Sequence, residues 1–187
     1  IFASGWRKGR MKQIIIDRIE NKFDEYDFNF ISDQFCVKDN SVIFSGSTEN
    51  SSDEIFYLDT VILPPKKINL GREVYQTESV NGCYINHFKP HSRKENGSAI
   101  IKIHSGPTSC SNYTYSNERE YWRDRGFGFI EIDYRGSTNY GINYRKTLDG
   151  NWGIYDTQDV IDVINYLSGM GFYDPKKIIL KGSSAGG

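Results

Sequence analysis

The spacing of apolar residues changes about a third of the way along the chain. Residues 1–63 hold short apolar runs between polar, turn-prone stretches, and no run keeps the 3.6-residue period of a helix. Strands are predicted at Gln13–Ile19, Ser41–Ser45 and Glu54–Leu58. So few strands cannot bury both of their faces alone. This part is therefore expected to belong to a larger β structure, with a linker or boundary at Leu63–Asn69.

The second part of the chain alternates strand and helix patterns. Asn117 can cap a helix, with Glu120 three residues on and Gly126 at its end, and residues 156–168 place apolar side chains on one helical face. This alternation predicts a parallel sheet covered on both faces. The predicted strands are Cys83–Lys89, Ser98–His104, Phe127–Asp133 and Lys177–Lys181, and the predicted helices are Asn117–Arg125 and Asp156–Ser168.

Composition permits a buried core and excludes some partners. The chain is 37% hydrophobic and 14% aromatic, and its 23 basic and 24 acidic residues leave a net charge of −1. A nucleic-acid partner is not expected, because no basic field is present. A membrane span is not expected either, since no apolar run reaches about 18 residues.

The cysteines and glycosylation sequons add little. Cys36, Cys83 and Cys110 have no metal-ligand spacing, and their odd number does not favour a disulfide framework. We therefore expect no metal and no cofactor. The sequons at Asn50, Asn96 and Asn112 would matter only in a secreted chain. The first residue is not Met, so the location stays open, with the cytoplasm favoured, and the oligomeric state is not predicted.

The chemistry is concentrated at the end of the sequence. Gly182-Ser183-Ser184-Ala185-Gly186-Gly187 fits G-x-S-x-G in one frame, which centres on Ser184. A strand before this motif, and glycines two residues to either side of the serine, are what a sharp strand-to-helix turn requires. Ser184 is therefore the predicted nucleophile, and a flexible Gly/Ser loop is the alternative.

A second motif follows the predicted strand Ser98–His104. Acyl-transfer hydrolases need two backbone N–H donors for the developing oxyanion, one from the residue after the nucleophile and one from an early strand-to-loop turn. Ala185 and Gly106, the latter within His104-Ser105-Gly106-Pro107, are predicted to supply them. The alternative is an ordinary Gly-Pro turn.

Three ordered segments together resemble the prolyl oligopeptidase family of serine peptidases, in particular its acylaminoacyl-peptidase and dipeptidyl-peptidase-like branches. His104–Pro107 is similar to that family's H-G-G-P turn, although position 105 is Ser rather than Gly. Residues 133–141 resemble its D-Y-R-G-S-x-x-Y-G segment, and residues 174–187 resemble its D-P turn and serine elbow. Asp133 and Arg135 are interpreted as residues that fix their loop rather than touch substrate.

The resemblance implies an α/β-hydrolase fold preceded by the end of a β-propeller. Residues 1–65 would be the last part of the propeller, and residues 66–187 the first part of an α/β-hydrolase peptidase domain that stops after the elbow. The triad Asp and His would then lie beyond Gly187, because such folds carry them after the serine. His104 precedes the nucleophile and cannot be the base, and this chain alone is expected to be inactive.

Three functions remain open on the sequence alone. The leading hypothesis is a serine peptidase that hydrolyses short peptide substrates through an acyl-enzyme intermediate. The same triad would serve a carboxylesterase or another acyl hydrolase. A non-catalytic pseudoenzyme is the third, and it requires loss of the triad Asp or His.

Overall fold

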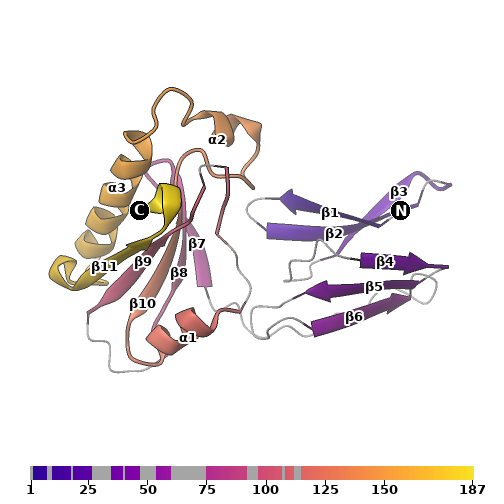
Figure 1. Cartoon of the computed structure of the whole chain (residues 1–187), viewed down its shortest axis with the longest axis horizontal. Helices are drawn as coiled ribbons and strands as arrows, with labels where there is room; N and C mark the ends of the chain where they lie inside the picture. The colour runs from indigo at the N-terminus through magenta and orange to yellow at the C-terminus, as the bar shows by residue number, and fades with distance from the viewer. Residues whose placement is uncertain are drawn as a thin grey trace. The chain divides into compact units, whose positions relative to one another are not determined.

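The computed structural model of the chain separates into two compact units (Figure 1). The first unit comprises residues 1–72 and 112–116, and the second residues 73–111 and 117–187. The structure describes residues 2–7, 10–17, 19–26, 35–39, 41–46, 54–59, 75–91, 97–106, 108–111 and 115–187. The predicted linker Leu63–Asn69, the three sequons and Pro107 lie outside these residues.

The first unit contains two antiparallel sheets with three strands each. The strands of the first sheet are β1 (Phe2–Arg7), β2 (Arg10–Asp17) and β3 (Lys22–Tyr26), and those of the second are β4 (Phe35–Lys38), β5 (Ser41–Gly46) and β6 (Glu54–Asp59). The predicted strands correspond to β2, β5 and β6, although β2 ends at Asp17 and Ile19 lies in the following turn. Ser41 pairs with Asp59, so β5 and β6 form a hairpin.

The second unit is built on a five-stranded mixed sheet of order β11-β9-β10-β8-β7. Its strands are β7 (Tyr75–Val80), β8 (Cys83–Phe88), β9 (Ala99–Ile103), β10 (Gly128–Asp133) and β11 (Ile178–Gly182). β9 runs parallel to β10 and β11, but β8 is antiparallel to β10 and to β7. The prediction of a fully parallel sheet was wrong at this end. Asn81 (φ 46°) and Gly82 (φ 95°) form the tight turn of a β7–β8 hairpin.

Helix α3 (Tyr155–Gly169) covers one face of this sheet. Val163 and Leu167 are buried and pack in one core with Ile130 and Ile132 of β10. Val160 and Ile164, which the sequence places on the core face, are half-buried beside them. The helix therefore presents the predicted apolar face to the sheet, but Val163 and Leu167 rather than Val160 and Ile164 lie at the centre of that face. None of the helices among the described residues combines the length and the apolar character needed to cross a membrane.

The opposite face carries helix α1 (Asn117–Arg123) and a row of polar side chains. Directly opposed residues on neighbouring strands point to the same face of a sheet. Lys181 opposes Lys102, Lys102 opposes Glu131, and Glu131 opposes Asn86. We call these four residues the polar row. The next row on this face lies two residues closer to the strand ends and contains Asp133 of β10. The polar row therefore lies directly beneath the carboxyl ends of β9 and β10.

Glu131 is the one acid of the polar row, and it is buried. It is 4% exposed, and its Oε1 lies 3.9 Å from Nη1 of Arg119 in α1. The Arg119 guanidinium in turn lies over the Phe88 ring, 4.1 Å from its centroid. Burial raises the pKa of the Glu131 carboxyl to about 7, although Arg119 and Lys102 act in the opposite direction. The loss of hydration therefore outweighs the attraction of the two cations.

Two features of the second unit are not indicated by the sequence pattern: a short helix, and a close contact between a glycine and a tyrosine. Helix α2 (Ile142–Lys146) has five residues and no side-chain cap. On β10, Gly128 leaves room for the phenol of Tyr173, which a Cβ at position 128 would overlap. The Tyr173 hydroxyl lies 2.7 Å from Nε2 of His87. His87 is 2% exposed and lies next to the last residue of β8.

Replacing the buried carboxyl of Glu131 should stabilise the protein at alkaline pH. Its folded pKa of about 7 exceeds the ordinary 4.5, so its contribution to stability is present below pH 4.5 and is lost as pH rises through 7. Glu131→Gln should raise the unfolding free energy by up to about 3 kcal/mol at pH 8 and leave it nearly unchanged at pH 4.5. Scanning calorimetry at both values measures this, with the exposed Asp149→Asn as control. An equal gain at both values would contradict the assignment.

Candidate active site

The G-x-S-x-G segment forms a strained strand-to-helix turn. β11 ends at Gly182, and a short 3₁₀ turn covers Ser184–Gly186. Ser184 has a φ of 53°, in the left-handed region that non-glycine residues rarely adopt. Such a conformation costs on the order of 1–3 kcal/mol and persists only where its surroundings enforce it. Ser184 is also exposed. The backbone geometry and exposure match those expected of a nucleophile elbow.

The two glycines of the motif are required by close backbone contacts. A Cβ on Gly182 would overlap the carbonyl oxygen of Gly186. A Cβ on Gly186 would lie 2.7 Å from the carbonyl oxygen of Ile103 and 2.8 Å from that of His104. The elbow therefore packs directly against the backbone where β9 ends. These contacts bring the predicted nucleophile segment and the predicted donor segment together.

The 104–106 turn follows β9 and is held from below by Tyr134. Gly106 has a φ of 75°, which favours glycine, and the Tyr134 hydroxyl donates a hydrogen bond to its carbonyl oxygen at 3.0 Å. Burial raises the pKa of this phenol to about 12, so it stays protonated and can donate. Ser105, the departure from H-G-G-P, is exposed. The change at position 105 therefore places no side chain in the core.

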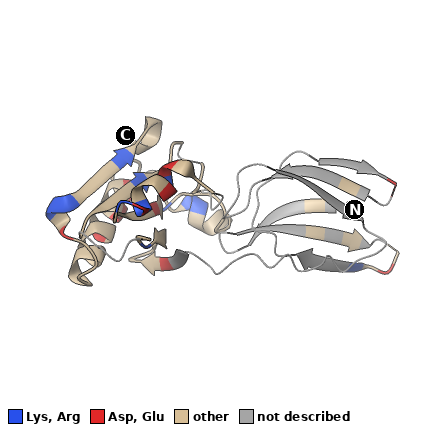
Figure 2. Cartoon of the chain, turned by 90° about the horizontal axis from the view of Figure 1, so that it is seen from below, with Lys and Arg blue, Asp and Glu red and all other residues tan. Residues whose placement is uncertain are grey.

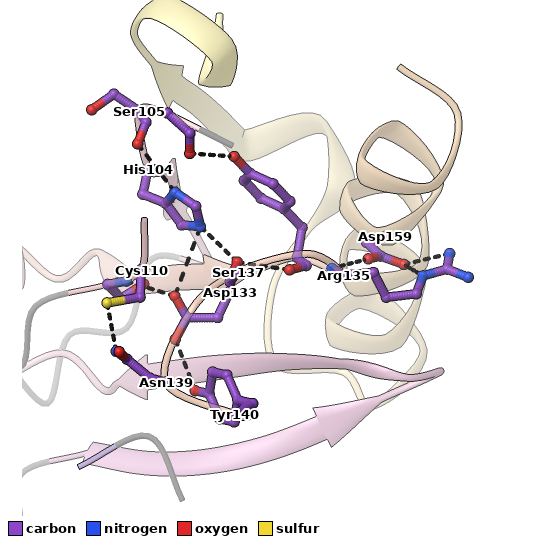
Figure 3. A network of polar contacts seen from close by, with 12 residues as sticks. His104, Ser105, Cys110, Asp133, Arg135, Ser137, Asn139, Tyr140 and Asp159 are labelled. Atoms are coloured by element: carbon purple, nitrogen blue, oxygen red, sulfur yellow. Dashed lines mark hydrogen bonds and ion pairs between the residues drawn. The ribbon is translucent and has the colours of Figure 1, made fainter. Parts of the chain in front are cut away.

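His104 links the same turn to the loop after β10 (Figure 3). Its ring stacks on Tyr134, with centroids 4.3 Å apart and an angle of 16° between the planes. Its Nε2 lies 2.7 Å from the Ser137 hydroxyl, and that hydroxyl donates to the carbonyl oxygen of Tyr134 at 2.7 Å. Ser137 must therefore accept the hydrogen on His104 Nε2. Burial lowers the pKa of His104, although Asp133 acts in the opposite direction.

Asp133, His104 and Ser137 form a trio that looks like a catalytic triad but cannot act as one. His104 Nε2 lies 4.0 Å from Asp133 Oδ1, and Figure 3 shows the three side chains pointing toward one another. Ser137 is fully buried, however, and its hydrogen is directed at a backbone carbonyl. Asp133 accepts hydrogen bonds from the Ser111 amide at 2.6 Å and the Tyr140 hydroxyl at 2.8 Å. The trio therefore holds loops together.

Arg135 fixes the same segment to helix α3. Its amide and its Nε donate to the Asp159 carboxylate at 2.7 and 2.8 Å, and its guanidinium lies 4.3 Å from the Tyr155 ring centroid. Asp133 and Arg135 thus bind different partners rather than each other. Both are occupied within the protein, as the interpretation of them as loop-fixing residues requires.

The remaining candidates lie away from the elbow. His91 is exposed, with its Nε2 2.5 Å from Glu120. Cys83 is buried, which raises the pKa of its thiol to about 12, and Cys110 is half-buried near Asn139. Among the described residues, no group of three or more His, Cys, Asp or Glu side chains is placed to hold a metal ion.

Sequence reasoning singled out the segment 133–141 but gave no role to Tyr134, Ser137 or Tyr140. Each of these three side chains makes a hydrogen bond that supports the 104–106 turn or Asp133. Their contacts depend on the parallel pairing of β9 with β10. The D-Y-R-G-S-x-x-Y-G pattern was the available signal in the sequence. It indicates the loop but not the residues that the loop contacts.

Comparison with known proteins confirms the resemblance stated above. Residues 113–187 match the model of the prolyl oligopeptidase family. The acylamino-acid-releasing enzyme of Arabidopsis thaliana is 35% identical over 97 residues, which cover 50% of this chain and 13% of that enzyme. The chain therefore spans about an eighth of the length of this relative.

Solved structures show the fold. A puromycin-hydrolyzing peptidase from Mycobacterium tuberculosis superposes with a TM-score of 0.82 at 22% identity, over 98% of this chain and 32% of that one. The acylaminoacyl peptidase of Pyrococcus horikoshii gives 0.76 at 17% identity, over 99% and 32%. The second unit is accordingly an α/β-hydrolase domain with a mixed sheet.

Adding a methyl group at Gly186 should disrupt the elbow. The new Cβ would lie within 2.8 Å of two carbonyl oxygens that belong to β9 and the turn after it, so the backbone of the elbow must move. In the full-length protein, Gly186→Ala should lower the rate of Ser184 modification by a serine-directed fluorophosphonate at least about a hundredfold. Gly169→Ala is the matched control, since a Cβ there meets nothing within 4 Å. Equal rates in both variants would show that the elbow tolerates the methyl group.

Removing the Tyr134 hydroxyl should loosen the 104–106 turn without emptying the space beneath it. Tyr134→Phe keeps the ring stacked on His104 but loses the bond to the Gly106 carbonyl. A hydrogen bond of this kind contributes about 1 kcal/mol, so the modification rate should fall about fivefold. The rate constant at saturating reagent separates this loss from weaker binding. A change confined to binding would mean that Tyr134 does not support the turn.

Proposed function

We propose that the protein is a serine-type peptidase that hydrolyses short peptides through an acyl-enzyme intermediate on Ser184. The observation that carries this proposal is the exposed Ser184 in left-handed backbone geometry, in an elbow whose Gly186 packs against the carbonyl oxygens of Ile103 and His104. Strain of this kind persists where function requires it. The peptidase names of the relatives support the choice of substrate class.

The proposed reaction uses two backbone N–H groups as oxyanion donors. The Ser184 hydroxyl attacks the peptide carbonyl, and the N–H groups of Gly106 and Ala185 donate hydrogen bonds to the oxygen that becomes negative. The serine proton passes to a histidine and then to the departing amine, which leaves an ester on Ser184. Water activated by the same histidine hydrolyses that ester and frees the enzyme.

The histidine and its carboxylate partner belong beyond Gly187 in this proposal. In α/β-hydrolases the serine precedes the acid and the histidine along the chain. His104 is unsuited to the role, since its Nε2 is engaged by Ser137 and its ring stacks on Tyr134. The 187 residues by themselves should therefore leave Ser184 unactivated.

The domain arrangement is part of the same proposal. Residues 1–65 are assigned to the end of a β-propeller, and residues 66–187 to the first part of the peptidase domain. The first unit contains antiparallel three-stranded sheets, and propeller blades are antiparallel sheets of four strands, so the assignment is compatible with incomplete blades. A propeller would restrict access to short, flexible peptides, which favours a peptidase over an esterase.

The test is fluorophosphonate labelling of the full-length protein, with the modified peptide identified by mass spectrometry. We expect labelling at Ser184, loss of labelling in Ser184→Ala, and no labelling of the 187-residue chain alone. Labelled enzyme should then be compared on acylated and free short peptides and on simple esters. Hydrolysis of esters alone would replace the peptidase with an esterase, and an unlabelled, folded full-length protein would leave the pseudoenzyme.

A further inference from the structure

Two lysines of the polar row face each other directly beneath the candidate active site. Lys181 of β11 and Lys102 of β9 are directly opposed across the parallel pair. Lys181 comes immediately before Gly182 of the elbow, and Lys102 comes two residues before His104. Like charges directly opposite each other on neighbouring strands are destabilising. The arrangement therefore tends to separate the ends of the two strands that carry the predicted nucleophile and donor turn.

Glu118 of α1 lies between the two lysines. Its Oε2 is 3.8 Å from Lys102 Nζ, and its Oε1 forms an ion pair with Lys181 Nζ. Each carboxylate oxygen thus takes one lysine, so a single negative charge bridges the two strands. The side chain of Glu118 is 31% exposed and those of Lys102 and Lys181 are 37% and 53% exposed. Water screens pairs of this exposure, and their effect is modest.

Basic residues lie at both ends of β11 (Figure 2). Two of them, Lys176 and Lys177, precede the strand, far from the elbow. Lys181 differs from them because it has a directly opposed lysine and a bridging acid. Positive charge alone therefore does not distinguish Lys181, but its directly opposed lysine together with the bridging Glu118 does.

We propose that Glu118 is a positioning residue, which holds the elbow end of β11 against the end of β9 by bridging Lys181 and Lys102. It does not touch substrate. This inference rests on the proposed function of Ser184. A bridge at this point matters because Gly186 already contacts the Ile103 and His104 carbonyls, so any spreading of the strands changes the spacing of Ser184 and Gly106. A displacement of about 1 Å at such a site can cost on the order of a hundredfold in rate.

Glu118 could instead act only within its own helix, where an acid in the first turn is favourable. The two roles differ in their response to the loss of a lysine. If Glu118 offsets repulsion between Lys181 and Lys102, removing Lys181 should repair the loss of Glu118. If it acts only on the helix terminus, removing a lysine on β11 should repair nothing.

The experiment measures the rate constant of Ser184 labelling at saturating fluorophosphonate in the full-length protein. Glu118→Gln should lower it about two- to fivefold, and adding Lys181→Met should restore it to within about 1.5-fold of wild type. Glu120→Gln, on the same helix with the same change of charge, should leave it unchanged, because Glu120 contacts Arg119, Arg123 and His91 rather than β9 or β11.

Salt provides a second measurement on the same proteins. Raising the ionic strength screens a net attraction in wild type but a repulsion in Glu118→Gln, so it should slow labelling of the first and speed labelling of the second, relative to Glu120→Gln. A normal rate in Glu118→Gln, or a low rate that Lys181→Met leaves uncorrected, overturns the positioning role. Absence of labelling in wild type would instead overturn the proposed function.

Discussion

The close contact between Gly186 and the carbonyl oxygens of Ile103 and His104 sets the geometry around which the candidate site is arranged. It joins two segments about 80 residues apart in the sequence, and it leaves no room for a side chain at the point of contact. The parallel pairing of β11 with β9 brings these segments to the same edge of the sheet. Ser184 then takes a left-handed backbone conformation, because the chain must turn sharply between two fixed positions.

The α1 face of the sheet changes character toward this contact. An apolar row that includes Phe129 and Ile100 comes first, then the polar row, and then the level of Asp133 and the 104–106 turn. The Tyr134 hydroxyl donates a hydrogen bond to the turn, and the Ser137 hydroxyl accepts one from His104, while Asp133 at the same level accepts hydrogen bonds from Ser111 and Tyr140. Neutral donors with fixed directions suit a site where charge develops only during reaction. The buried Glu131 shows that the charged row has an energetic cost.

Local patterns predicted much of the second unit. The strands β8 to β11 and helices α1 and α3 lie within two residues of their predicted bounds, since each combines an apolar run with a clear end signal. β7 was missed because its Gln76-Thr77-Glu78-Ser79 segment carries no apolar alternation, and the Asn81-Gly82 turn signal after it was not used. The motifs identified Ser184 and Gly106 as candidates, but the side chains that hold the turn depend on strand register. Strand register depends on which segments pair in the folded chain, so the sequence of one segment does not reveal it.

The contact between Gly128 and Tyr173 limits the order in which these two positions can change. The phenol occupies the space that a β-carbon on residue 128 would need. A larger residue at 128 is therefore disfavoured while the Tyr173 phenol keeps its position, and it is favoured only after position 173 has accepted a smaller one. That first step removes the hydroxyl beside His87 and leaves a buried imidazole to find a new partner. The favoured order of substitution is therefore position 173 first and position 128 second. The intermediate protein then has an empty space in its core, which destabilises it.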